Sequence, residues 1–284
     1  MIPFMVRNLK LYFRDKSAVF FSLLGILVIL TLYLLFLGNV WVSNFNGVPG
    51  VRFVMDSWIM AGLLAISSFT TTMGALGVMV DDKVKKINKD FVASPFPKSS
   101  MTAGYIFSTI LIGVVMSLVS LLIAEVYILI NGGSLINLPD FLKVFALIVL
   151  ATLSNSAIVV FLVSLFKTNS AYGTASTLIG TMIGFLTGIY LPIGEFPSSI
   201  QWLIKLFPPS HAAALMRQVM MAPAMEKTFA GAPQETLTNF KRMMGVEFTF
   251  GNTPLSPFIS VIILLATAVF FYLLALWSLS RKKN

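Results

Sequence analysis

The amino-acid sequence predicts an all-α membrane protein with six transmembrane helices, and three observations support this fold class. Hydrophobic residues make up 57% of the 284 residues and charged residues only 11%, less than half of the roughly 25% that soluble domains carry. The apolar residues form continuous runs, without the alternation of membrane β-barrel strands. No Pro-, Gly- or Ser-rich linker divides the chain, so we expect one transmembrane domain over residues 1–284. This composition argues against a soluble enzyme or a nucleic-acid-binding protein.

Six runs are long and apolar enough to cross a bilayer, which requires about 20 residues per helix. They are Ala18–Leu37, Trp58–Val80, Thr102–Ile130, Phe145–Phe166, Ala171–Leu191 and Phe258–Leu279. With both termini inside, the inner segments carry 13 of the 20 lysines and arginines and the outer segments carry 7. Because basic residues favour the cytoplasmic side, we expect a multi-pass protein of the plasma membrane with cytoplasmic termini. The net charge of +9 is then a property of the loops.

Residues 1–16 predict an amphipathic helix that lies in the membrane interface before the first span. Basic and apolar side chains recur at helical spacing on neighbouring faces: Arg7, Lys10 and Arg14 on one, and Val6, Leu9 and Phe13 on the other. Such a helix places its apolar side in the acyl region and its basic side on anionic headgroups. A simple orientation anchor is the alternative, since the topology rule alone requires the charges.

The inner loop at residues 81–100 holds the densest charge cluster of the chain. A short helix over Asp82–Phe91 is expected, with acidic residues at its N-terminus and Pro95 and Pro97 behind it. Such a helix between two spans suits the docking of a cytoplasmic partner. Its candidate contact residues are Asp82, Lys85, Lys86, Ile87, Asp90 and Phe91. The alternative is a solvated loop that sets topology, which would not need the apolar residues.

Small and polar residues form stripes on the second and fifth predicted spans. The candidate residues are Ser67, Thr71 and Gly74 on the second span, and Thr177, Thr181 and Gly184 on the fifth. Small faces let helices approach closely, so helix packing, including dimerisation, is one interpretation. The other is a polar-lined substrate path along a dimer axis.

The segment at residues 192–257 is the one large extramembrane part, and proline divides its first half. Pro192 is expected to end the fifth span. Ile200–Phe207 and Ala212–Met221 are apolar but too short to span, which is typical of re-entrant elements. A re-entrant hairpin is therefore expected here, with Ser210 or His211 capping its second helix. Its marker residues are Pro197, Pro208, Pro209, His211 and Arg217.

Residues for bond chemistry are sparse. The chain has no cysteine and one histidine, so we expect no metal site; His211 alone is interpreted as structural. The phosphate-binding loop, the G-x-S-x-G elbow and the H-E-x-x-H pair are all missing from the sequence. Glu125 lies near the outer end of the third span, where an interfacial carboxylate is expected rather than an ion site.

In this order the four features resemble the permease subunit of an ATP-binding-cassette exporter of the type-two superfamily, to which drug, lipid-linked glycan and teichoic-acid exporters belong. Residues 1–16 match the family's connecting helix, and Asp82–Pro95, with KDFVASPF, matches its coupling helix. Phe196, Pro197, Pro208, Pro209, His211 and Arg217 match its pattern after span five. The outer segment Ala222–Thr253 is longer than in the shortest permeases.

The resemblance implies a non-enzymatic transport subunit with several partners. These are a second permease, as a homodimer or heterodimer, two separate ATPase subunits that bind ATP and Mg, and membrane lipid. The chain itself is expected to bind no cofactor and no nucleic acid. The implied substrate is amphipathic: a drug, lipid, peptide or glycolipid. Two alternatives remain open, an ion-coupled secondary transporter and a non-transporting membrane sensor or resistance protein.

Overall fold

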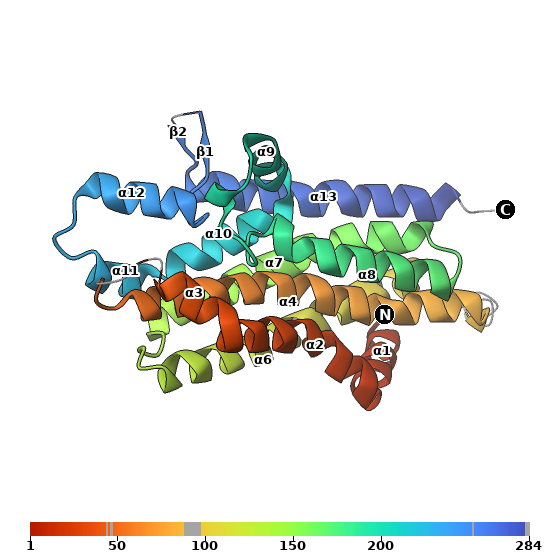
Figure 1. The fold of residues 1–284 in the computed structure, drawn as a ribbon. Coiled ribbons are helices and arrows are strands. Elements are labelled where there is room, and N and C mark those ends of the chain that lie inside the picture. The colour runs from red at the N-terminus through yellow and green to blue at the C-terminus, as the bar shows by residue number, and fades with distance from the viewer. Residues whose placement is uncertain (44, 46–47, 88–97, 252, 282–284) are drawn as a thin grey trace.

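The protein is a bundle of long helices in a computed structural model that describes residues 1–43, 45, 48–87, 98–251 and 253–281 (Figure 1). Its helices are α1 (Ile2–Arg14), α2 (Lys16–Leu32), α3 (Gly38–Ser43), α4 (Val51–Val84), α6 (Lys98–Ile130), α7 (Leu138–Leu165), α8 (Asn169–Leu186), α9 (Ser198–Leu206), α10 (Pro208–Met220), α11 (Ala222–Thr228), α12 (Gln234–Met243) and α13 (Pro257–Arg281). A π-helical turn η1 (Tyr33–Leu37) joins α2 to α3, and a 3-10 turn η2 (Ile193–Glu195) precedes α9. Strands β1 (Thr249–Phe250) and β2 (Thr253–Pro254) pair antiparallel, with Thr249 opposite Pro254.

Within the described residues, five helices are long and apolar enough to cross a membrane. They cover Lys16–Phe36, Val51–Val84, Ser100–Ile130, Leu138–Leu165 and Pro257–Ser278. This confirms the all-α membrane fold and supports five of the six predicted spans. The fifth predicted span corresponds to α8, which is 18 residues long and contains glycine, serine, threonine or asparagine at half of its positions. It nevertheless runs beside the long helices (Figure 1).

The second span is longer than the sequence predicted, because α4 continues through charged residues at both of its ends. Trp58–Val80 was expected, and the helix covers Val51–Val84. It therefore includes Arg52, Asp56 and Asp82, whose charges are paired with other side chains as described below. The predicted start of a new helix at Asp82 is wrong, since that residue lies in the last turn of α4.

The inner loop begins at a tight turn after α4. Lys85 caps the helix, and Lys86 follows with a left-handed φ of 60°. Residues 88–97 lie outside the described part of the chain. The predicted helix over Asp82–Phe91, together with the stop at Pro95 and Pro97, is therefore mostly beyond what the structure describes.

The end of α8 is set by a glycine rather than by Pro192, as the sequence had suggested. Gly188 has φ +66°, and its N–H donates to the carbonyl of Phe185 at 3.0 Å. The N–H of Ile189 donates to the carbonyl of Gly184 at 2.9 Å. This pair of bonds is the Schellman arrangement, which ends a helix at a left-handed residue.

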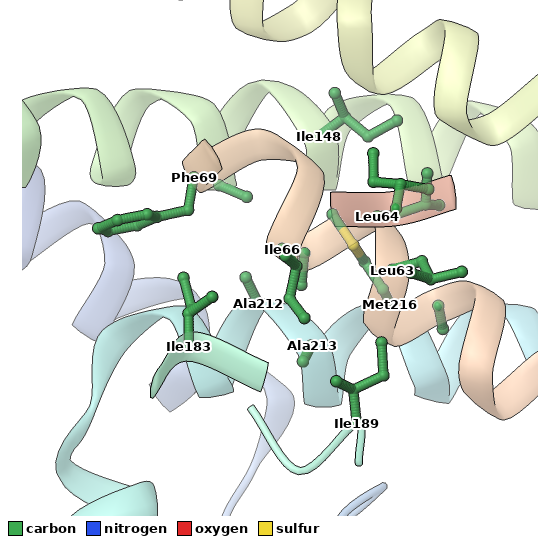
Figure 2. Packing of buried hydrophobic residues seen from close by; sticks show 14 of the residues in the cluster. Leu63, Leu64, Ile66, Phe69, Ile148, Ile183, Ile189, Ala212, Ala213 and Met216 are labelled. Carbon is green, nitrogen blue, oxygen red and sulfur yellow. The ribbon is translucent and has the colours of Figure 1, made fainter. Parts of the chain in front are cut away.

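The core lies around α4, which contacts α2, α6, α7, α8 and α10. Figure 2 shows side chains of α10 meeting those of α4 in the middle of this core. Ala212, Ala213 and Met216 from α10 and Leu63, Leu64 and Ile66 from α4 are all buried. The small alanines of α10 allow its backbone to approach α4 closely. A helix too short to span is thereby packed as a core element.

Figure 1 shows α1, the last turns of α4 and the C-terminal turns of α13 at one end of the bundle. The helices α3, α11 and α12 lie at the opposite end. This arrangement agrees with the predicted grouping of both termini and the charged loop on one side.

Candidate functional site

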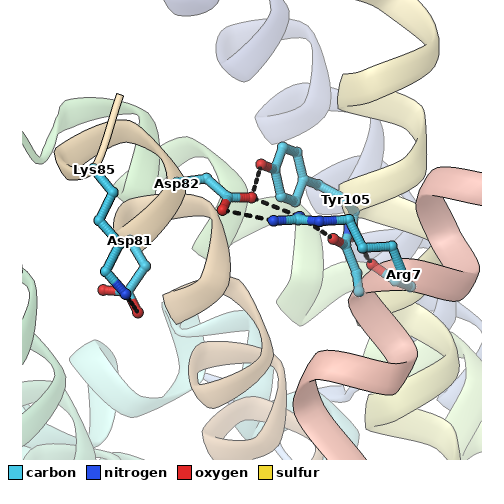
Figure 3. A network of polar contacts seen from close by, with 7 residues as sticks. Arg7, Asp81, Asp82, Lys85 and Tyr105 are labelled. Carbon is cyan, nitrogen blue, oxygen red and sulfur yellow. Dashed lines mark hydrogen bonds and ion pairs between the residues drawn. The ribbon is translucent and has the colours of Figure 1, made fainter. Parts of the chain in front are cut away.

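A buried charge cluster joins three helices where α4 reaches the charged loop (Figure 3). Arg7 of α1 donates from Nη1 and Nη2 to the two carboxylate oxygens of Asp82 at 2.8 and 2.9 Å. The hydroxyl of Tyr105, on α6, donates to the same carboxylate at 2.5 Å. The side chain of Asp82 is 4% exposed and that of Arg7 is 28% exposed. The hydrogen bond to Asp82, above all, raises the pKa of Arg7.

The last turn of α4 also contacts the neighbouring span and α8. Lys83 donates from Nζ to the carbonyl of Val163, at the end of α7, at 3.1 Å. Asn169, at the start of α8, donates from Nδ2 to Asp81 at 2.6 Å. Four helices are therefore bonded directly to the turn from which the inner loop leaves, and we call this turn with its contacts the α4 junction.

Helix α1 contacts the bundle through a face that the sequence did not single out. Phe4, Asn8 and Tyr12 are buried, and Phe4 meets the ring of Tyr105 edge-on at 4.9 Å. Val6 and Phe13 are exposed, which agrees with an apolar side available to lipid. Arg7 points into the cluster, so the predicted basic face does not act as one unit.

The predicted docking residues of the loop fall into three groups. Asp82 is buried in the α4 junction and is not available to a partner. Lys85 and Lys86 are exposed, and Lys85 has an open ion pair of 3.7 Å with Asp81. Ile87 follows directly, while Asp90 and Phe91 lie outside the described residues. Sequence reasoning missed Tyr105, Lys83 and Asn169; polar residues at the ends of predicted spans were the available signal.

The predicted path residues on α4 are involved in helix packing. Ser67 is fully buried, and its hydroxyl meets that of Ser120 of α6 at 2.8 Å. Thr71 is fully buried as well and donates to the carbonyl of Ser67 at 2.6 Å. A Cβ at Gly74 would meet Ser22 of α2 at 2.7 Å. In this structure Ser67 and Thr71 therefore do not line an open path, because Ser67 is bonded to α6 and Thr71 is bonded within α4.

The corresponding residues on α8 are open. Thr177 and Thr181 are exposed, and apart from the adjoining backbone of α8 itself no described atom would lie within 4 Å of a Cβ at Gly173 or Gly180. These four residues form what we call the α8 polar face. Gly184 does not belong to it, because the ring of Tyr190 covers its α-carbon. The predicted stripe of Thr177, Thr181 and Gly184 is therefore not one continuous open surface.

The predicted hairpin residues hold the outer segment against the bundle. Pro208 and Pro209 occupy the first two positions of α10, where a missing N–H costs no helical bond. Phe207 is the N-cap, so the predicted cap at Ser210 or His211 is wrong. Ser210 instead donates to the carbonyl of Leu186, at the end of α8, at 2.6 Å. Pro197 is the N-cap residue of α9.

Arg217 of α10 is fully buried. It donates from Nη2 to the carbonyl of Gly188 at 3.0 Å, and its guanidinium lies 4.9 Å from the ring centre of Trp58. A Cβ at Gly62 would meet Nη2 at 3.2 Å, and one at Gly245 would meet Nη1 at 3.3 Å. Within the described ranges no carboxylate forms an ion pair with Arg217, and burial lowers its pKa to about 9.

His211, which its isolation in the sequence led us to interpret as structural, is held through both nitrogens of its ring. It is buried, with Nε2 at 2.9 Å from the carbonyl of Lys205 and Nδ1 at 3.0 Å from the hydroxyl of Ser260. The carbonyl can only accept, so Nε2 carries the proton and Nδ1 accepts from Ser260 in the neutral ring. Burial lowers the pKa of His211.

Two further carboxylates lie at the other end of the spans. Asp56 is buried in α4 and accepts from Tyr33 at 2.9 Å and from Arg52 at 3.1 Å; sequence reasoning had placed it in a loop. Glu125 of α6 accepts from the backbone N–H of Ile136 at 2.9 Å. Over the described ranges, no group of three or more acidic, histidine or cysteine side chains could hold a metal ion.

Comparison with known proteins agrees with this architecture. A family model described as ABC-2 family transporter protein matches residues 41–277, which spans α4 to nearly the end of α13. No curated protein matches the chain. The match covers most of the chain and leaves out α1 and α2. The chain belongs to the ABC-2 family of transporter proteins.

Proposed function

We propose that this protein is the permease of an ATP-driven exporter of amphipathic molecules, working as a dimer with separate ATPase subunits in the plasma membrane. In this proposal α8 is the fifth of six spans, and residues 193–220 form the re-entrant element. The inner loop receives the ATPase, and the dimer alternates its opening between the two sides of the membrane.

The observation that carries the proposal is the α8 polar face. The exposed side chains of α13, such as Phe270 and Leu273, are apolar, as contact with lipid tails requires. Helix α8 exposes Leu178, Met182 and Phe185 as well, but beside them it presents open glycines and threonines. The hydroxyls of Thr177 and Thr181 donate to carbonyls of their own helix at 3.0 and 2.8 Å. A face of this kind permits close approach of a second helix, so it suits a second copy of the chain with the substrate path between them.

The α4 junction supports the coupling part of the proposal. An ATPase that displaced the loop would pull on a turn bonded to α1, α6, α7 and α8 together. The buried Asp82 ties α4 to α1 and α6, so these helices would move as one unit. The ion-coupled alternative is less favoured, because Asp56 and Asp82 both have an arginine partner.

Cross-linking tests the dimer. The chain contains no cysteine, so Thr177→Cys introduces a single thiol on the α8 polar face. Oxidation in membranes is expected to yield a disulfide-linked dimer. Leu273→Cys, on the exposed side of α13, is the matched control and should stay monomeric. A cross-link at Leu273→Cys with none at Thr177→Cys would place the dimer interface elsewhere.

Substitution tests the same face by function. Gly180→Leu should insert normally but lose export, because a large side chain separates the two copies. Gly25→Leu of α2 is the matched control, since a Cβ at Gly25 would likewise meet no described atom within 4 Å beyond the adjoining backbone of its own helix. Equal export by the two variants would show that the α8 polar face contacts lipid.

The coupling loop is tested by joint substitution of Ile87 and Phe91 with aspartate. Two charges in a packed contact cost several kcal/mol, and about 1.4 kcal/mol is tenfold in affinity, so the ATPase should no longer co-purify. Substitution of Lys85 and Lys86 with serine should have little effect, because exposed ion pairs contribute about 0–1 kcal/mol. If the aspartate variant still co-purified with the ATPase, the loop would serve only to set the membrane topology.

A further inference from the structure

A cavity of about 880 Å³ lies in the outer segment, between α11, α12, the end of α10 and the start of α13. Its volume is in the range of small-molecule binding sites, roughly 300–1,000 Å³. It is separate from the α8 polar face and from the α4 junction, since it shares no lining residue with either. The transport proposal does not use it.

The walls of the cavity are mainly apolar. Met225 and Phe229 of α11, Leu237 of α12 and Leu255 ahead of α13 line it. Phe229 is held in place by Phe240, with ring centres 4.8 Å apart. The cavity is thus a preformed apolar space with a few polar groups, which is the usual composition of a ligand site.

The polar groups at the wall carry a net negative charge. Lys241 and Glu247 neutralise each other through an ion pair of 2.8 Å, and Gln218 donates its amide N–H to the carbonyl of Val246 at 2.8 Å. Glu226 is exposed, and no residue in the described part of the chain forms a hydrogen bond or ion pair with it. One uncompensated carboxylate therefore stands at the edge of an apolar cavity.

The cavity lies next to the first residues of α13, a helix that could cross the membrane. Ser256 and Pro257 line it, and Pro257 is the first residue of α13, which has the composition of a membrane span. The next residue, Phe258, is 69% exposed. The cavity therefore lies beside the first turn of a membrane span, where a molecule held in the lipid surface can approach it.

We propose that this cavity binds an amphipathic organic monocation, with its apolar body between α11 and α12 and its positive group beside Glu226. An anionic amphiphile would meet an uncompensated carboxylate and is disfavoured. Binding here requires neither ATP nor a second subunit, so the site and the transport function succeed or fail separately.

Titration with rhodamine 6G, a fluorescent amphipathic monocation, tests this site on the full chain in phosphatidylcholine nanodiscs, with empty nanodiscs as the blank. Fluorescence anisotropy should show saturable binding. Glu226→Gln should weaken it by about 3- to 5-fold, the effect of one exposed ion pair. Ala222→Trp, which fills the cavity from an exposed wall position, should weaken it by about tenfold or more.

Two controls make the test specific. Glu235→Gln removes a charge from an exposed residue of α12 that does not line the cavity, so it should bind like the unchanged chain. Fluorescein, which has a related ring system and a negative charge, should bind much more weakly. Equal binding of the two dyes, no saturable rhodamine 6G binding, or full binding by Glu226→Gln would overturn the proposal, whether or not Ala222→Trp folds.

Discussion

Replacing Arg7 with glutamine tests whether the α4 junction holds α1 to the bundle. The substitution removes two charge-assisted hydrogen bonds of 2.8 and 2.9 Å. It leaves a carboxylate that is 4% exposed with Tyr105 as its remaining described partner. Breaking a buried ion pair costs about 3–5 kcal/mol. Since Arg7 is 28% exposed and water screens such a pair, we expect a cost at or just below the lower end of that range, about 2–3 kcal/mol.

Three further variants distinguish the contribution of the Arg7–Asp82 ion pair from the effect of removing a single charge. Asp82→Asn should cost less, about 1–2 kcal/mol, because the freed arginine can turn toward water. The double variant should lose less stability than the two single variants added together, because contacting residues couple by about 0.5–3 kcal/mol. Lys10→Gln removes an exposed charge from the same helix and should change stability by about 0.5 kcal/mol at most.

The assay is thermal unfolding of the detergent-purified chain, followed by tryptophan fluorescence, together with protease cleavage after α1. At roughly 2–4 °C per kcal/mol for a chain of this size, Arg7→Gln should lower the apparent Tm by roughly 5–10 °C. It should also expose α1 to cleavage before the bundle melts. If Arg7→Gln and Lys10→Gln gave the same Tm and the same cleavage, the pair would not hold α1 in place.

Three further predictions concern the outer segment and α8, each measured by thermal unfolding. The free energy of unfolding should fall as the pH decreases below about 6.5, because His211 takes up a proton in the unfolded chain while burial keeps its ring neutral in the folded one. His211→Gln should flatten this pH dependence. An unchanged pH profile in that variant would exclude His211 as its source. Arg217→Lys should destabilise by about 2 kcal/mol or more and Arg217→Met by less, since only the lysine leaves an unpaired buried charge; the reverse order would contradict this account. Gly188→Ala should destabilise the protein by about 1–2 kcal/mol, because φ is +66° at this position and the new Cβ would meet Ile193 at 2.8 Å. Gly180→Ala, the control, should be neutral or stabilising by about 1 kcal/mol. Equal effects of the two substitutions would refute the assignment of Gly188 as the residue that ends α8.

Much of the fold follows from the sequence because a bilayer leaves few choices. Backbone groups in hydrocarbon must be bonded within the segment, so a long apolar run such as Phe258–Leu279 has to be a helix, and the structure has α13 there. The prolines at 208 and 209 likewise require an interruption, and α9 ends immediately before them. The isolation of His211 in the sequence favoured a structural residue, and the structure buries it with both ring nitrogens hydrogen-bonded.

Other features depend on contacts that no local pattern contains. Asp82 looked like the start of a loop helix, but Arg7, 75 residues away in the sequence, neutralises it and lets α4 continue. At the other end of α4, Arg52 and Asp56 form a local i,i+4 pair, but their burial depends on the distant Tyr33 and Tyr127, which bond them. Ser67 and Thr181 look alike in sequence, yet one is buried against α6 and the other is open. Local sequence determines whether a segment can be a membrane helix, whereas only tertiary packing decides which charges are paired and which small-residue face remains uncovered, since both depend on residues far apart in the chain.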